Sequence, residues 1–210
     1  MLTIDLNGKW SMKNTLESEW TTGTVPGSVY SDLLRDGRME DPFYRDNEDR
    51  VRELSRFDFE YQRSFHVGSH FLQCDRISLQ CGGLDTLADI RINGHLIGET
   101  DNMHRSYEFD VKDKLVYGKN HIHILFHSPI AYIEKKQKEF PLWGSRETMD
   151  GFPHIRKAHC MLGWDWGPQL PDMGIWRDIS IRGFQKGRLR DVSILQKHED
   201  GCVILDTKVL

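Results

Sequence analysis

Residues 57–67 read Phe57-Asp-Phe-Glu-Tyr-Gln-Arg-Ser-Phe-His-Val67, and apolar side chains alternate with polar ones along nearly all of this stretch. A period of two residues is typical of a β-strand that is buried on one face. The same alternation recurs in four further segments, at 76–81, 88–92, 121–126 and 175–181. Short strands separated by turn signals predict an all-β protein built as a β-sandwich.

Turn and cap signals punctuate these strands. Asn93-Gly94 stands between two apolar arms and predicts a tight type I′ hairpin. Ser128-Pro129 predicts the start of a charged helix that runs through Glu139.

A second short helix is expected near the amino terminus. Ser28 can cap it, and Gly37 marks its end. We expect Val29, Leu33 and Leu34 to share one face of this helix.

The apolar periodicity is lost between residues 140 and 174, although four of the six tryptophans lie between residues 143 and 176. Within this segment Trp164-Asp165-Trp166 places two indoles around one carboxylate. Glycine and proline on both sides disfavour a continuous helix or a central strand. We therefore expect a long, irregular, tryptophan-rich loop, which needs either a ligand or a covering partner.

Two indoles beside a carboxylate are suited to sugar recognition. Aromatic rings cover the apolar C–H face of a sugar, whereas a carboxylate accepts charge-assisted hydrogen bonds from hydroxyl groups. Asp165 is the candidate for the hydroxyls, and Trp164 or Trp166 for the ring face. The alternative is structural: both indoles pack the loop onto the sandwich, and Asp165 caps a neighbouring backbone amide.

Cations lie just before this loop, at Arg156, Lys157 and His159. A cation here could hold Asp165 or another carboxylate ionised and in place. The alternative is that all three side chains are simply exposed to solvent.

The composition excludes several classes of protein. The chain has 210 residues, 38% of them hydrophobic, which is enough to build a sizeable core. Its 28 basic and 32 acidic side chains are interspersed, with a net charge of -4, so we expect no nucleic-acid partner. No stretch approaches the roughly 20 apolar residues of a membrane span, so we expect no membrane partner either. The first residues lack the pattern of a secretion signal, and we expect a cytoplasmic protein or one lacking its signal.

Cysteine and histidine spacing predicts neither a metal site nor a cofactor. No Cys-x-x-Cys pair is present, so free thiols are expected, with a Cys74–Cys81 disulfide as the alternative. His121, His123 and His127 share the wetter face of the strand at 121–126 rather than forming a metal site.

The last residues differ from the rest. The alternation restarts at Val192 and again at Val203, after a turn at Glu199-Asp-Gly201, and the final strand has no visible partner. We therefore expect residues 187–210 to begin a second domain and the chain to be a fragment.

Nine short motifs resemble the amino-terminal region of the β-mannosidases, in the glycoside hydrolase family that also contains β-galactosidases and β-glucuronidases. They are Leu6-Asn-Gly-Lys-Trp10, Val25-Pro-Gly-Ser-Val-Tyr30, Asp41-Pro-Phe-Tyr-Arg-Asp-Asn-Glu48, Gly83-Leu-Asp-Thr-Leu-Ala-Asp89, Ile92-Asn-Gly94, Asp101-Asn-Met103, Arg156-Lys-Ala158, Gly163-Trp-Asp-Trp-Gly-Pro168 and Gly174-Ile-Trp-Arg177. The Trp-Asp-Trp loop and Asp-Pro-Phe-Tyr favour a mannosidase over its relatives.

The resemblance implies a jelly-roll, galactose-binding-domain-like sandwich over residues 1–186 and the start of an immunoglobulin-like sandwich over 187–210. In full-length members a (β/α)₈ barrel follows. These members are retaining hydrolases that remove terminal, non-reducing β-D-mannosyl residues, using two barrel carboxyl groups about 5 Å apart. The resemblance thus implies no catalytic residue in this chain, which we expect to be inactive alone.

The same resemblance implies a binding role for Trp164, Asp165 and Trp166, which would face the barrel and line the pocket for the β-mannoside. Asn47-Glu48 looks like the pair that carries the family's general acid, but it precedes the first strand predicted above, and we expect a loop near the domain interface. The alternative functions are a non-catalytic carbohydrate-binding module, a purely structural domain, or the same domain of a β-galactosidase or β-glucuronidase.

Overall fold

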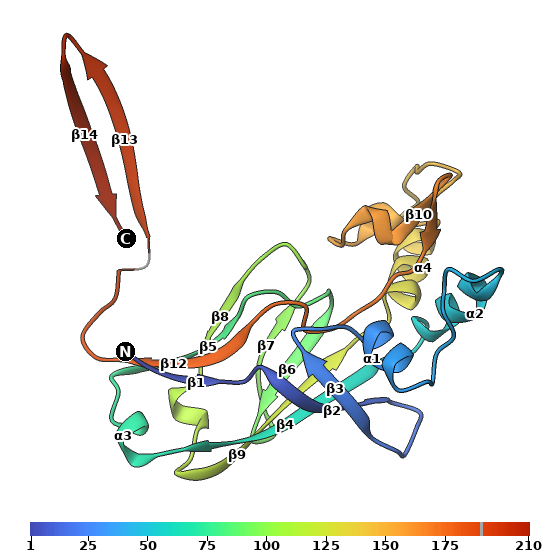
Figure 1. Cartoon of the computed structure of the whole chain (residues 1–210), viewed down its shortest axis with the longest axis horizontal. Coiled ribbons are helices and arrows are strands. Elements are labelled where there is room, and N and C mark those ends of the chain that lie inside the picture. Colours follow the sequence, from blue (N-terminus) through green and yellow to red (C-terminus); the bar gives the residue numbers. More distant parts are fainter. Residues whose placement is uncertain (190) are drawn as a thin grey trace.

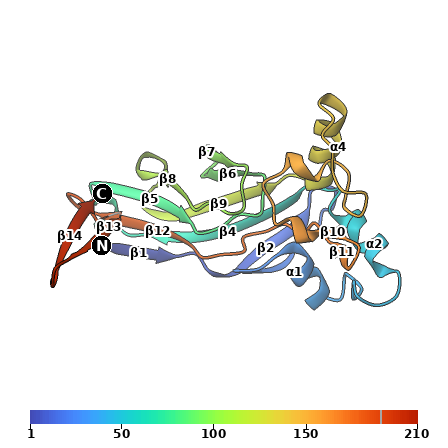
Figure 2. The ribbon, with the colours of Figure 1, turned by 90° about the horizontal axis from the view of Figure 1, so that it is seen from above.

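The protein is described by a computed structural model that covers residues 1–189 and 191–210. Within these residues, a four-stranded and a six-stranded antiparallel sheet form a β-sandwich (Figures 1 and 2). The predicted all-β jelly-roll sandwich is therefore confirmed.

The smaller sheet has the order β1 (Leu2–Asp5), β12 (Ile179–Phe184), β5 (Arg76–Cys81) and β8 (Tyr107–Asp110). The larger sheet has the order β3 (Thr21–Val25), β2 (Gly8–Asn14), β4 (Phe59–Val67), β9 (Gly118–Phe126), β6 (Ala88–Ile92) and β7 (His95–Thr100). Outside the sheets lie α3 (Ser69–Leu72) and the 3₁₀ turns η1 (Lys112–Lys114), η2 (Phe152–His154) and η3 (His159–Met161).

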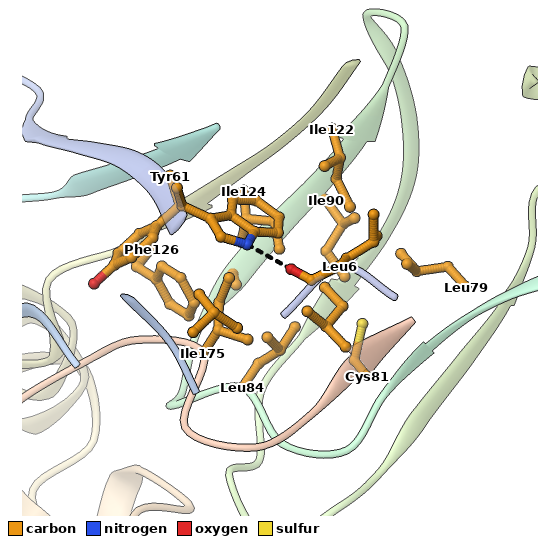
Figure 3. Packing of buried hydrophobic residues seen from close by; sticks show 14 of the residues in the cluster. Leu6, Tyr61, Leu79, Cys81, Leu84, Ile90, Ile122, Ile124, Phe126 and Ile175 are labelled. Atoms are coloured by element: carbon orange, nitrogen blue, oxygen red, sulfur yellow. Dashed lines mark hydrogen bonds between the residues drawn. The ribbon is translucent and has the colours of Figure 1, made fainter. Parts of the chain in front are cut away.

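The core fills the space between the sheets. Strands β4 and β9 pair along their whole length, with Tyr61 opposite Ile124 and Phe59 opposite Phe126. These four side chains are at most 2% exposed, and the Tyr61 and Phe126 rings meet edge to face at 5.6 Å (Figure 3). Alternation along the two central strands thus directs their apolar residues into one layer.

Two predicted strands begin later than their sequence pattern indicates. Phe57 is 36% exposed and lies outside β4, because it belongs to the turn that follows residue 54, where its N–H donates to the Leu54 carbonyl at 3.3 Å. The strand predicted at 175–181 begins only at Ile179. The residues before it serve another purpose, since Gly174 and Asp85 exchange two backbone hydrogen bonds of 2.9 Å.

The predicted Asn93-Gly94 hairpin is confirmed. It joins β6 to β7, and both residues have positive φ, 51° and 83°. A type I′ turn requires this conformation, which asparagine and glycine adopt at low cost.

Both helices predicted from cap signals are present. Ser28 caps α1 (Val29–Arg35) through a capping box. Ser128 caps α4 (Pro129–Glu139) by accepting the Ala131 N–H at 2.9 Å. One detail was wrong: Leu34 is 44% exposed, because the inward face of α1 is made by Val29, Tyr30 and Leu33 instead.

The segment around Asn47-Glu48 is a helix, α2 (Asn47–Leu54), and not the loop that the sequence predicted. Its apolar face consists only of Val51, which is buried, and Leu54, which is partly buried, so the segment gives a short and weak hydrophobic periodicity. Acidic residues in the first turn and Arg52 in the last turn match the helix dipole.

Helices α1, α2 and α4 gather at one end of the sandwich, far from the end where β1 begins (Figures 1 and 2). Near that other end the chain passes into β13 (Val192–Glu199) and β14 (Cys202–Val209), which pair with each other and are exposed throughout. The final strand thus has a partner, β13, contrary to expectation. Among the described residues, no helix combines the length and apolar character that crossing a membrane requires.

The outer face of the larger sheet carries a histidine held between two carboxylates. The His127 ring nitrogens lie 3.4 Å from Asp58 and 3.2 Å from Asp89. The hydrogen bond to Asp58, and then the bond to Asp89, raise the pKa of His127 to about 9 against partial burial. The predicted wetter face of this strand is confirmed, since His121 is exposed and His123 and His127 are half-buried.

We expect this pair of contacts to make folding stability pH-dependent above neutrality. A raised pKa means that the folded state binds the proton more tightly, so the stabilisation is complete below pH 6.5 and lost as the pH rises through about 9. In the wild type, the free energy of unfolding measured by urea titration should decline as the pH rises from 6 to 10. In His127→Gln the part of this decline that comes from the histidine should be absent. His95→Gln, at an exposed histidine, is the control, and an equal decline in both variants would contradict the assignment.

Candidate functional site

The Trp-Asp-Trp motif forms the tip of a small β-hairpin. Strand β10 (Leu162–Trp164) pairs with β11 (Gly167–Gln169), and Asp165 and Trp166 make the turn. The segment from 140 to 174 is thus less irregular than predicted, although no continuous helix or central strand occurs in it. Gly163 has a φ of 87° and lies so close to the Gln169 side chain that a Cβ would clash. The hairpin therefore requires glycine at this position.

All three residues at the tip are accessible to solvent. Trp164 is 40% exposed and Trp166 80% exposed, and their rings lie 5.2 Å apart at an angle of 51°. Asp165 is exposed, and within the described part of the chain it makes no hydrogen bond or ion pair. The indoles are therefore not packed into the sandwich, and Asp165 does not cap a backbone amide.

The hairpin borders a hollow of about 450 Å³. One side of the hollow is lined by residues before and at the start of α2, namely Pro42, Phe43, Arg45 and Glu48. The hairpin residues 164–169 form another side, and Glu147 adds a further carboxylate. Phe43 is 76% exposed. The structure thus brings two sequence motifs, Asp-Pro-Phe-Tyr and Trp-Asp-Trp, to one cavity.

The charges of this cavity are mostly negative. Glu48, Glu147 and Asp165 contribute carboxylates, whereas Arg45 is the cation among the lining residues. Such a lining accepts hydrogen bonds from hydroxyl groups and repels anions. Sequence reasoning missed Arg45 and Glu147 and set Glu48 aside. Arg45 and Glu48 belong to the motif that begins at Asp41-Pro-Phe-Tyr, so this motif was the signal that could have indicated them.

The base of the hairpin segment is fixed by a buried cation. Lys157 is 2% exposed, and its ammonium contacts the Asp85 carboxylate and donates to the Asp172 backbone carbonyl. The expectation that a cation before the loop holds a carboxylate thus holds for Lys157, but its partner is Asp85 and not Asp165. Arg156 and His159 are exposed.

Asp172 ends the segment and connects it to α1. Its carboxylate accepts the Tyr30 N–H at 3.0 Å and the Met173 N–H at 2.7 Å. Burial raises the pKa of Asp172 to about 6, although these hydrogen bonds and Lys157 oppose the rise. Both ends of segment 157–172 are therefore anchored in the interior while its tip is exposed.

Within the described residues, no group of three His, Cys, Asp or Glu side chains is arranged to hold a metal ion. The four cysteines are free thiols; Cys74 and Cys81 are buried, and Cys160 and Cys202 are exposed.

The two-sheet antiparallel fold is a galactose-binding-domain-like sandwich, and the aromatic and acidic hairpin lies at one end of it. The profile of the family described as "Glycosyl hydrolase 2 galactose-binding domain-like" matches residues 10–177, and the chain belongs to this family.

Its relatives include β-mannosidases. The sequence is 33% identical to "Beta-mannosidase" of Capra hircus over 192 residues, which is 88% of this chain and 22% of that protein. The structure matches the β-D-mannosidase of Dictyoglomus thermophilum with a TM-score of 0.92 and 35% identity, covering 100% of this chain and 26% of that one.

A β-D-glucuronidase of Dictyoglomus thermophilum matches with a TM-score of 0.66 and 15% identity, over 100% of this chain and 32% of that one, and shares the fold alone. The chain thus spans about a quarter of the length of the mannosidases that it matches.

Replacing the buried cation tests how the site segment is anchored. Lys157→Met should lower the free energy of unfolding by about 3–5 kcal/mol, because it leaves the Asp85 carboxylate buried without its cation. Urea unfolding followed by circular dichroism measures this loss. Lys136→Met, at an exposed pair with Glu139, is the control and should change stability by less than about 0.5 kcal/mol. Equal small effects in both variants would refute the anchor.

Proposed function

We propose that this chain is the amino-terminal domain of a retaining β-mannosidase that hydrolyses terminal, non-reducing β-D-mannosyl residues. The observation that carries the proposal is the exposed hairpin, whose two indoles and free carboxylate border one hollow in a fold that superposes on a β-D-mannosidase at a TM-score of 0.92. In this proposal the domain completes the substrate pocket, and the catalytic carboxylates belong to a barrel in the rest of a longer protein.

The binding roles follow from the chemistry at the hairpin tip. Trp164 or Trp166 covers the apolar face of the terminal sugar, and Asp165 accepts hydrogen bonds from hydroxyls remote from the reacting carbon. Such a remote grip accelerates the reaction when it tightens in the transition state. Asp165 is suited to this task because no protein group occupies its acceptor positions among the described residues.

The lining charges favour a neutral sugar over a uronic acid. Three carboxylates, on Glu48, Glu147 and Asp165, face one cation, on Arg45, so the carboxylate of a glucuronide would meet net repulsion. This supports a mannosidase over the glucuronidase alternative. A non-catalytic carbohydrate-binding module remains the second candidate, because the same exposed indoles would serve it equally well.

The proposal extends to partners, domains and location. The partners are the β-mannoside and the further domains of the longer protein, and the exposed β13–β14 hairpin is the start of a second domain at residue 187. We place the protein in the cytoplasm, which agrees with four free thiols.

Asp165→Ala, made in the longer protein, should lower kcat/KM on an aryl β-mannoside, because it removes charge-assisted hydrogen bonds to the sugar. The loss of transition-state stabilisation should be about 2 kcal/mol or more. The melting temperature should stay within a few degrees of the wild type, since Asp165 is exposed. Asp113→Ala, at an exposed aspartate in η1, is the control. Full activity with lowered stability would make Asp165 a structural residue.

The 210-residue chain alone should bind mannose weakly or not at all, because a one-sided hollow buries only part of a sugar. Isothermal titration calorimetry with mannose measures this. Tight binding would instead identify the domain as a carbohydrate-binding module.

A further inference from the structure

Helix α2 presents three polar side chains to the site hairpin. Glu48, Arg52 and Ser55 are spaced by four and three residues, which places them on one face of the helix and its C-cap. The segment that leaves the hairpin tip, residues 169–171, lies against this face. The sequence pattern marked Glu48 only as a misleading catalytic motif.

Each of the three side chains makes a hydrogen bond to that segment. The Gln169 N–H donates to Glu48 Oε1 at 2.6 Å, and Arg52 Nη1 donates to Gln169 Oε1 at 2.9 Å. Ser55 Oγ donates to the Pro171 carbonyl at 2.7 Å. Arg52 is itself held by Asp49, 2.9 Å away. Two of the bonds carry a charged partner and are therefore stronger than neutral ones.

We propose that Glu48 and Arg52 are positioning residues for the sugar site. They fix the exit strand β11, and so the orientation of the Trp164–Trp166 tip relative to the opposite side of the hollow. The inference rests on the proposed function only for what the tip binds.

The hairpin needs such support because it is very short. Only two residue pairs join β10 to β11, and an isolated two-stranded hairpin is marginally stable at best. Its entry strand is held by Leu162, which is fully buried in a small cluster with Ile133 and Ile155. Its exit strand ends at Gln169, which is half-buried, and the next residue, Leu170, packs only partly buried against the main core. Polar contacts from α2 add to this partial packing.

The same helix also holds the opposite side of the hollow. Pro42, Phe43 and Arg45 directly precede α2, and Asn47 at its start is 5% exposed and donates to the Asp41 carbonyl at 2.8 Å. One rigid element therefore connects both walls. Its contacts to β11 set the distance across which a sugar must fit.

Hydrogen exchange of the 210-residue chain, measured without sugar, tests the proposal. In Glu48→Ala the amides of residues 164–167 and 169 should exchange about tenfold or more faster, because the Gln169 N–H loses its acceptor. Glu48→Gln retains a carbonyl oxygen at this position and should exchange within about threefold of the wild type. Arg52→Met should accelerate the same peptide, and amides of β4 and β9 should be unaffected in all variants.

Glu53→Ala is the matched control, since Glu53 lies on α2 but pairs with Arg56. Hairpin exchange unchanged in Glu48→Ala and Arg52→Met, or raised equally in Glu53→Ala, overturns the proposal. A Glu48→Gln variant whose hairpin amides exchange as fast as those of Glu48→Ala also overturns it. Because no sugar is present, these outcomes are independent of whether Asp165 binds a mannoside, which the activity of Asp165→Ala decides separately.

Discussion

The site depends on one buried charge. The Lys157 ammonium is enclosed, and an unpaired cation there would cost several kcal/mol, so the Asp85 carboxylate and the Asp172 carbonyl must stay beside it. Asp85 in turn exchanges two backbone hydrogen bonds with Gly174. The two ends of the segment between Lys157 and Gly174 are thus held together. Its tip can therefore project into solvent without contributing to the stability of the fold.

The apolar core and the hollow beside the hairpin lie in different parts of the molecule. The two sheets bury the apolar residues. The hollow lies at the other part of the molecule, beside α2 and the hairpin, at the end where α1, α2 and α4 gather (Figures 1 and 2). Trp166 is 80% exposed, which is unfavourable unless a ligand or partner covers it. Helix α2 holds the hairpin by polar contacts at Gln169, so the two indoles at its tip stay exposed.

The segment around Asn47-Glu48 shows how local pattern and tertiary role can diverge. Sequence reasoning set aside its likeness to a catalytic motif, and in the structure Glu48 accepts a backbone N–H of the hairpin. Its conformation was nevertheless predicted wrongly. A helix of eight residues whose apolar face is only Val51 and Leu54 gives a weak periodic signal, and it also makes contacts with residues more than a hundred positions away.

The sequence by itself determined the sandwich, the Asn93-Gly94 turn, the caps at Ser28 and Ser128 and the acidic and aromatic composition of the Trp-Asp-Trp loop. These features depend on alternation, turn chemistry and capping, which act over a few neighbouring residues. Only the tertiary structure decided that Lys157 pairs with Asp85 and that α2 forms hydrogen bonds with β11. It also decided that Phe43 and Trp164 line one hollow. Such contacts join residues distant in the chain, and their partners are selected by burial and geometry rather than by local pattern.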